Sequence, residues 1–232
     1  MSGHSKWAQI KRKKGAADVK RGKLFARIAK QITIAARLGK NLDTYVSIAR
    51  AENMTKDVID RAIKKGTGEL GDGAQIEEVL YEAYGPSGSA FLITALTDNR
   101  NRTVADLRAI FNKYGMTLAN SGAVQYLFDH YAIFTVAPGN DVDVAQLALI
   151  DLGAEDVVVE DDVVIAYVIP TQLDAMRQAI EAAGFVIQDA RIGYVPKLPH
   201  AIDDATKERI IRILEIIDDL DDVDSVETNA EL

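Results

Sequence analysis

The sequence predicts an α+β protein with a helical N-terminal domain followed by two α/β modules, the second inserted into the first. Three observations support this fold class. Apolar residues recur at helical spacing up to about residue 65, glycines crowd residues 66–73, and strand-like segments begin near residue 75. Hydrophobic residues make up 48% of the 232 residues, so the chain can bury a substantial core.

Residues 18–38 predict a long amphipathic helix, because they contain no proline and repeat apolar side chains at three- and four-residue steps. These apolar side chains are Leu24, Phe25, Ile28, Ile32, Ala35 and Ala36. A second series, here called the cationic stripe, consists of Lys20, Lys23, Arg27, Lys30 and Arg37. The stripe follows the same period on roughly the opposite side of the helix, so one face can pack while the other presents cations.

Two shorter helices are expected around 43–53 and 56–65, the second with Thr55 as its N-cap and Gly66 just beyond its end. The next segment, GTGELGDG, holds four glycines in eight positions and is typical of a linker. The first domain is therefore expected to span residues 1–74.

Beyond residue 75 the spacing predicts strands and helices in alternation. The first expected strands lie at 76–84, 89–97, 123–129 and 131–137. A helix at 103–114 is expected to begin at Thr103 and Asp106, which form a capping-box-like pair. The polar pair Asp129 and His130 is expected to separate the last two strands.

The following stretch predicts the order βαββαβ, the ferredoxin-like unit. Its elements are expected at 131–137, 141–152, 156–160, 163–169, 171–183 and 185–190. The preceding module lacks a helix and a strand, which 205–220 and 223–229 can supply. The middle domain is therefore expected to be discontinuous, with residues 75–129 plus 195–232 surrounding an inserted ferredoxin-like domain at 130–194.

Charge is distributed very unevenly along the chain. Residues 1–40 contain 12 Lys or Arg and one acid, Asp18, a net charge of +11, whereas residues 41–232 carry −19. The overall net charge of −8 conceals this asymmetry. Such a distribution is typical of an arm that binds a polyanion, attached to a body that phosphate would repel. Nucleic acid is therefore the expected partner.

The expected nucleic-acid-binding residues lie in this basic region, which lacks the acids that a solvated face normally mixes in. They are Lys6, Trp7, Lys11, Arg12, Lys13, Lys14, Lys20, Arg21, Lys23, Arg27, Lys30 and Arg37. Trp7 either stacks on a base or packs the arm onto the body. We expect the cations to face outward, free of carboxylate neighbours. Their phosphate contacts would supply affinity without sequence information.

Two further segments have alternative interpretations. Residues 97–103 join a strand to a helix N-terminus, a place that favours anions but also uses Asn, Asp and Thr as ordinary turn and capping residues. We expect a structural turn there, and the alternative is a secondary contact with RNA or a partner through Arg100, Asn101 and Arg102. The acidic end, 201–232, either closes the middle domain or shields the basic arm when no nucleic acid is bound, or docks on a basic protein.

The sequence argues against an enzyme. It has no cysteine, which excludes disulfides, thiolate chemistry and the usual zinc ligands. The histidines, His4, His130 and His200, are scattered, and we find no nucleophile with its base, metal cluster or phosphate-cradling loop. No cofactor, metal site or small-molecule substrate is expected.

A membrane is not an expected partner either. No apolar run approaches the ~20 residues that a membrane span needs, so a cytoplasmic location is expected. Attachment to a membrane surface through the basic helix is disfavoured, because the alanines on its apolar side suit helix packing better than acyl chains.

Three long motifs resemble the YebC/PmpR family. They are SGHSKWAQIKRKKGAADVKRGKLF, NMTKDVIDRAIKKGTGE and YEAYGPSGSAFLITALTDNRNRTVADLR. The resemblance begins at Ser2 and continues, more weakly, through the acidic C-terminal helix. The region between Gly39 and Ala51 departs from the family pattern, because it is shorter and carries fewer basic residues.

The resemblance implies a three-domain protein with a basic helical N-terminal domain and two ferredoxin-like modules. It also implies a transcriptional regulator that binds DNA. The alternative implied by the family is a factor that acts on mRNA or the ribosome, because its mitochondrial relatives include a translational activator of cytochrome c oxidase subunit I. Neither role is enzymatic.

Overall fold

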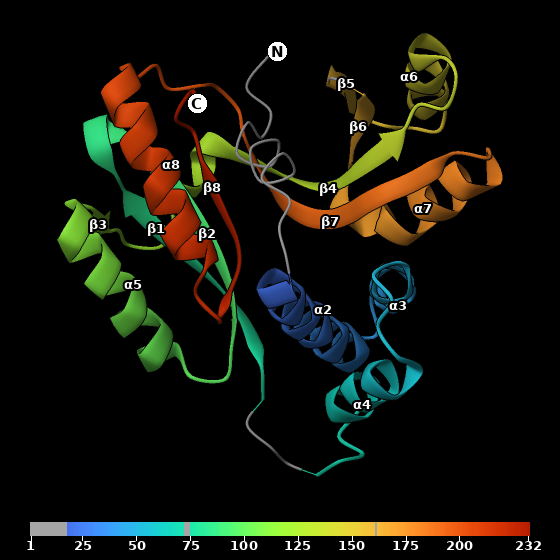
Figure 1. Cartoon of the computed structure of the whole chain (residues 1–232), viewed down its shortest axis with the longest axis horizontal. Coiled ribbons are helices and arrows are strands. Elements are labelled where there is room, and N and C mark those ends of the chain that lie inside the picture. Colours follow the sequence, from blue (N-terminus) through green and yellow to red (C-terminus); the bar gives the residue numbers. More distant parts are fainter. Residues whose placement is uncertain (1–17, 72–74, 161) are drawn as a thin grey trace.

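The computed structural model describes residues 18–71, 75–160 and 162–232, which form three parts around a common centre (Figure 1). Three helices form the helical part, and two four-stranded antiparallel sheets, each with its own helices, form the other two. This arrangement confirms the predicted α+β fold class.

Three helices make up the helical part: α2 (Asp18–Leu38), α3 (Leu42–Ala51) and α4 (Lys56–Gly66). Their apolar sides meet in a small core of their own. α2 and α4 approach closely at Gly66, where a Cβ would overlap the carbonyl oxygen of Thr33 and lie 2.8 Å from Cβ of Ala36. The Thr33 hydroxyl donates to the Ala62 carbonyl at 3.2 Å across the same contact. This close packing fixes which side of α4 faces solvent.

The first sheet has the strand order β3-β1-β2-β8. Its strands are β1 (Glu77–Tyr84), β2 (Ala90–Thr97), β3 (Thr117–Leu118) and β8 (Val223–Thr228). Helices α5 (Arg100–Tyr114) and α8 (Asp204–Asp218) cover one face (Figure 1) and enclose a core that includes Phe91, Phe111 and Leu214. β8 pairs with β2 although the whole second sheet lies between them in the sequence.

The second sheet has the strand order β5-β6-β4-β7. Its elements are β4 (Phe128–Ala137), α6 (Val142–Asp151), β5 (Asp156–Glu160), β6 (Val163–Val168), α7 (Leu173–Ala182) and β7 (Val186–Pro196). In both sheets a strand–helix–strand unit is split by another strand, because β1 lies between β2 and β3, and β6 between β4 and β5. We keep the division into 1–74, 75–129 plus 195–232, and 130–194 as a proposal.

The strand expected at 123–129 is wrong over most of its length, because Gln125–Leu127 form a short 3-10 helix and β4 begins only at Phe128. Two further expected boundaries are also wrong. α5 begins at Arg100 and is capped by Asn99, whose side chain accepts an amide hydrogen bond from the first turn, so Thr103 is not the start of the helix. Thr103 is instead buried inside the first turns. β4 also continues through Asp129 and His130, because both residues pair with β7 in an antiparallel ladder. The polar side chains of these two residues suggested that the strand is interrupted, but pairing with β7 keeps it continuous.

The helical part packs against both sheets. Ile34 of α2 forms a small apolar cluster with Leu96 of β2 and the nearby Ile76. On the other side, the backbone N–H of Thr44 in α3 donates to the Asp174 carboxylate of α7 at 3.2 Å. The helices are therefore held in a defined position relative to the two sheets.

Candidate nucleic-acid interface

Half of the expected binding residues belong to the N-terminal arm, residues 6–14. Lys6, Trp7, Lys11, Arg12, Lys13 and Lys14 lie outside the described residues. Lys20 and Arg21 lie within α2, but their side chains are outside the described part of the structure. A role for these eight residues in binding stays a prediction.

The first half of the cationic stripe faces the acidic end of α8. Lys23 Nζ lies 3.3 Å from the Asp219 carboxylate, and Arg27 Nη2 lies 3.3 Å from that of Asp218. Both cations also reach main-chain carbonyls, since Lys23 donates to Asp219 O at 2.7 Å and Arg27 to Asp218 O at 3.3 Å. Carbonyls at a helix C-terminus attract cations, so these contacts dock α2 on the end of α8.

Lys30 is the most deeply engaged of the described cations in the stripe. Its Nζ donates to the Asp222 carboxylate at 3.0 Å, to Asp221 O at 2.9 Å and to Leu96 O at 3.0 Å. An ammonium group has three N–H donors, and these three acceptors satisfy all of them. Lys30 therefore joins α2 to the first sheet and is not free to contact a phosphate.

Asp222 is the centre of this contact. It is 8% exposed and accepts hydrogen bonds from Lys30, from Arg102 at 2.7 Å, from Thr97 at 3.2 Å and from Thr103 at 3.0 Å. Burial opposes its ionisation, but the hydrogen bonds from Arg102, Lys30 and Thr103 outweigh burial and lower the pKa of Asp222 below its usual range. The carboxylate is therefore ionised and fixed at neutral pH.

The expectation that the stripe stands free of carboxylates is wrong for Lys23, Arg27 and Lys30. Spacing correctly placed these side chains on one face of α2, but it contains no information about the acidic segment opposite. The first interpretation of the acidic end is supported, because α8 packs on the first sheet and its last residues hold α2. Arg37 differs from the other three, since it is exposed and makes no ion pair within the described residues.

Further exposed cations lie elsewhere on the helical part. Besides Arg37 they are Lys40, Arg50, Lys56, Arg61, Lys64 and Lys65, and none forms an ion pair with another described residue. Arg61, Lys64 and Lys65 were not among the interface residues predicted from the sequence. Their spacing of three and four residues along α4 was the signal that could have found them, because it places all three on one helical face.

The turn before α5 is structural in its main contacts. Arg100 forms a bidentate pair with Glu77, in which Nη2 donates to Oε2 at 2.6 Å. Hydrogen bonding to this guanidinium lowers the pKa of the Glu77 carboxyl. Arg102 pairs with Asp98 at 2.9 Å and with Asp222. Asn101 is exposed. A secondary nucleic-acid contact through these residues stays a prediction.

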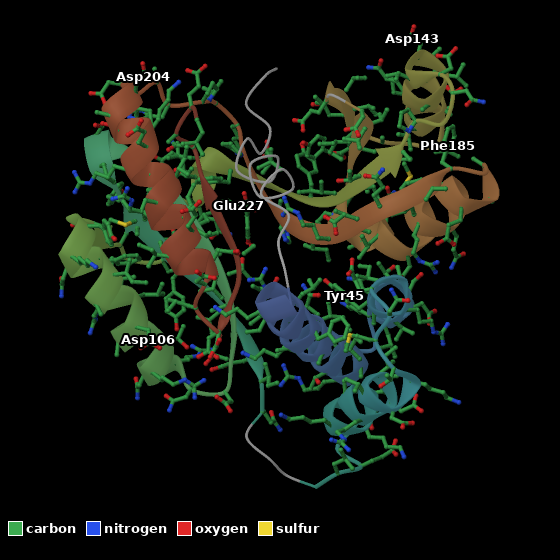
Figure 2. All side chains as sticks on the ribbon, viewed as in Figure 1. Tyr45, Asp106, Asp143, Phe185, Asp204 and Glu227 are labelled. Atoms are coloured by element: carbon green, nitrogen blue, oxygen red, sulfur yellow. The ribbon has the colours of Figure 1, made fainter. Side chains whose placement is uncertain are left out.

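A cavity of about 330 Å³ lies where the three parts meet. Its charged lining consists of Arg27, Glu52, Asp189, Arg191, Asp218, Asp224 and Glu227. Arg191 of β7 pairs with Glu227 of β8 at 3.2 Å, and Figure 2 shows Glu227 on the side of β8 that faces the other two parts. Burial opposes ionisation of Arg191, but Glu227 and Asp189 outweigh it and raise its pKa. Acids outnumber bases in this lining, so the cavity does not suit phosphate.

Within residues 18–71, 75–160 and 162–232, no three His, Asp or Glu side chains cluster as metal ligands would. In the same ranges, no helix combines the length and apolar character that crossing a membrane requires.

Two family models match the chain. The model for the TACO1/YebC protein N-terminal domain matches residues 5–69, and the model for the TACO1/YebC second and third domain matches residues 76–230. Together they span the helical part and both sheets. The resemblance noted in the sequence is thereby confirmed.

Individual proteins match over nearly the full chain. A "Probable transcriptional regulatory protein" of Desulforapulum autotrophicum is 44% identical over 220 residues, covering 91% of this chain and 89% of that protein. One of the same description from Desulfotalea psychrophila is 47% identical over 219 residues, covering 90% and 86%. The crystal structure of a conserved hypothetical protein from Aquifex aeolicus has a TM-score of 0.86 at 38% identity, covering 92% of this chain and 91% of that one.

These comparisons also bear on the class of protein. The two curated relatives are named as regulatory proteins, which confirms the prediction that the chain is not an enzyme. Both family models and these levels of identity lead to the same conclusion: the chain belongs to the TACO1/YebC family.

Proposed function

We propose that the chain is a nucleic-acid-binding regulatory protein, a cytoplasmic transcriptional regulator that holds DNA through its basic helical N-terminal domain. The names of its relatives support the regulatory class. One structural observation supports the binding of nucleic acid by the helical part. The helical part presents seven exposed cations, from Arg37 to Lys65, that form no ion pair with other described residues.

Unpaired cations on a small surface repel one another, which is unfavourable for the free protein. A nucleic-acid backbone relieves this repulsion and releases condensed counterions, which favours binding. The rest of the described chain is strongly acidic, so phosphate is directed to the helical part. The two sheets then hold the helices in position or contact a larger assembly, which is the transcription apparatus or the ribosome.

The structure changes which cations of the first domain are assigned to DNA. Lys23, Arg27 and Lys30 hold α2 against the first sheet, so we assign them to domain docking. The assigned contacts are instead the arm residues Lys6, Lys11, Arg12, Lys13 and Lys14, together with the exposed cations of the helical part. Contacts of Lys20 and Arg21 with nucleic acid, like those of the arm residues, stay predictions.

The alternative is a translation factor that acts on mRNA or the ribosome. Phosphate contacts supply affinity to any nucleic acid, so the exposed cations do not distinguish DNA from RNA. Crosslinking in cells, followed by sequencing of the recovered nucleic acid, separates the two roles. Recovery of chromosomal DNA supports a transcriptional role, whereas recovery of ribosomal or messenger RNA replaces it with translation.

Binding itself is tested by fluorescence anisotropy with a labelled duplex DNA over a series of salt concentrations. If ~6 phosphates are neutralised, log affinity falls against log salt with a slope of about −5 or steeper. Replacing Lys11, Arg12, Lys13 and Lys14 together with Ala should weaken binding to all sequences alike. A flat salt response of the unsubstituted protein would contradict electrostatic binding of DNA.

A further inference from the structure

A groove of about 300 Å³ lies between α2, α4 and the turn that leads into α5. We call it the α4–α5 groove. Its charged lining consists of Lys30, Arg61, Lys65, Arg102, Asp98 and Asp222. Four cations against two acids give this lining a net positive charge, in contrast to the acidic cavity at the centre of the molecule.

The two acids of the groove are already neutralised from within. Asp222 forms ion pairs with Lys30 at 3.0 Å and with Arg102 at 2.7 Å, and Asp98 forms an ion pair with Arg102 at 2.9 Å. These pairs fix the positions of one lysine and one arginine along the groove wall. The other two cations, Arg61 and Lys65, form no ion pair with any described residue.

Arg61 and Lys65 are one helical turn apart on α4, and both are exposed. Like charges at this spacing repel each other and destabilise a helix. Asp57 lies one turn before Arg61 on the same helix, but no ion pair forms between them in the described structure. Lys65 in the last turn suits the helix dipole, whereas Arg61 in the middle of α4 gains little from it.

α5 adds positive potential from the opposite side of the groove. Its first turn contains no acid and provides Arg102 to the groove wall. The amide groups at a helix N-terminus carry a partial positive charge that favours phosphate. The groove therefore has uncompensated cations on the α4 wall and the paired Arg102, from the first turn of α5, on the other.

We infer that the α4–α5 groove binds a backbone phosphate of duplex DNA, with Arg61 and Lys65 as the direct ligands and Arg102 as a fixed cation behind them. This inference rests on the proposed function and gives it a location. The paired acids Asp98 and Asp222 hold Arg102 in place and do not confront the phosphate as free charges. The groove places the phosphate contact beside the Lys30–Asp222 ion pair that joins the helical part to the first sheet.

The test compares two double variants that each remove two cations. Arg61→Ala with Lys65→Ala empties the groove of its unpaired charges. Arg108→Ala with Arg212→Ala is the matched control, because both arginines are exposed on α5 and α8 and form no ion pair with another described residue. Far-UV circular dichroism and thermal melts establish that both variants are folded before binding is measured.

Binding is measured with labelled duplex DNA over a salt series, using the full chain. The groove variant should bind about tenfold more weakly at low salt and lose about 1 from the magnitude of the salt slope, as expected for one phosphate contact. The control should keep the slope of the unsubstituted protein. If the groove variant retains the same slope and affinity as the control, the groove is not a phosphate site, although the proposed function stands. If the unsubstituted protein shows no salt-dependent binding, the proposed function itself fails.

Discussion

Replacing Asp222 with Ala should destabilise the protein more than any substitution at the neighbouring acids. Asp222 accepts hydrogen bonds from Lys30 and Arg102 and from the hydroxyls of Thr97 and Thr103. Its removal leaves two cations without their shared carboxylate and two hydroxyls without an acceptor. Because these groups come from α2, β2 and α5, the change should loosen the helical part from the first sheet.

The expected magnitude follows from the exposure of the groups involved. Removing one partner of a buried ion pair destabilises a protein by about 3–5 kcal/mol. The side chains of Lys30 and Arg102 are 23% and 49% exposed, and Lys30 keeps the carbonyls of Leu96 and Asp221, so solvent and these carbonyls offset part of the loss. We expect a loss of about 2–3 kcal/mol in the free energy of unfolding.

Urea denaturation followed by circular dichroism measures this change, with Asp219→Ala as the matched control. The Asp219 and Lys23 side chains are 71% and 42% exposed, so loss of their ion pair should change stability by less than about 1 kcal/mol. Equal small shifts in the two variants would refute the reasoning, because burial and the number of hydrogen bonds would then make no difference at Asp222.

Three further predictions follow from the structure. Gly66→Ala should destabilise the helical part by about 1–3 kcal/mol in thermal unfolding, because the new Cβ overlaps the Thr33 carbonyl; Gly22→Ala, in open space on α2, should stabilise it by about 0.5–1 kcal/mol. Glu82 is 2% exposed and accepts three backbone N–H groups, so Glu82→Ala should reduce stability by about 3 kcal/mol in urea, and no change would exclude this role. Asp222 has a lowered pKa, so its stabilising effect is complete above the ordinary value of 3.8 and is lost as the pH falls below that value. The difference in stability between the unsubstituted protein and Asp222→Ala should therefore shrink at low pH. A difference in urea midpoint or hydrogen exchange that stays constant with pH would contradict the lowered pKa.

The elements could be predicted because their signals are local. The helix at 18–38 and the strands at 156–160 were expected with the bounds that the structure has, since periodicity depends on neighbouring residues. The start of α5 was misplaced because Asn99 and Thr103 are both good caps, and only packing of Thr103 against Asp222 decides between them. β3 was missed, because a strand of two residues has no detectable period.

The candidate interface could be predicted only in part. Charge asymmetry pointed to the first domain, but it did not separate cations that dock α2 from cations that remain exposed. Arg27 and Asp218 are 191 residues apart in the sequence, so nothing near Arg27 indicates its partner. The α4–α5 groove depends in the same way on Arg61 and Arg102, which lie on different helices.

The sequence by itself determined most of the helices and strands, the position of the basic region and the family of the protein, because each of these is encoded in adjacent residues. Tertiary structure alone decided which cations are neutralised and which are exposed. Electrostatic energy depends on the distance between charges in space, and that distance is set when β8 returns to the first sheet and brings the acidic segment around Asp222 against α2.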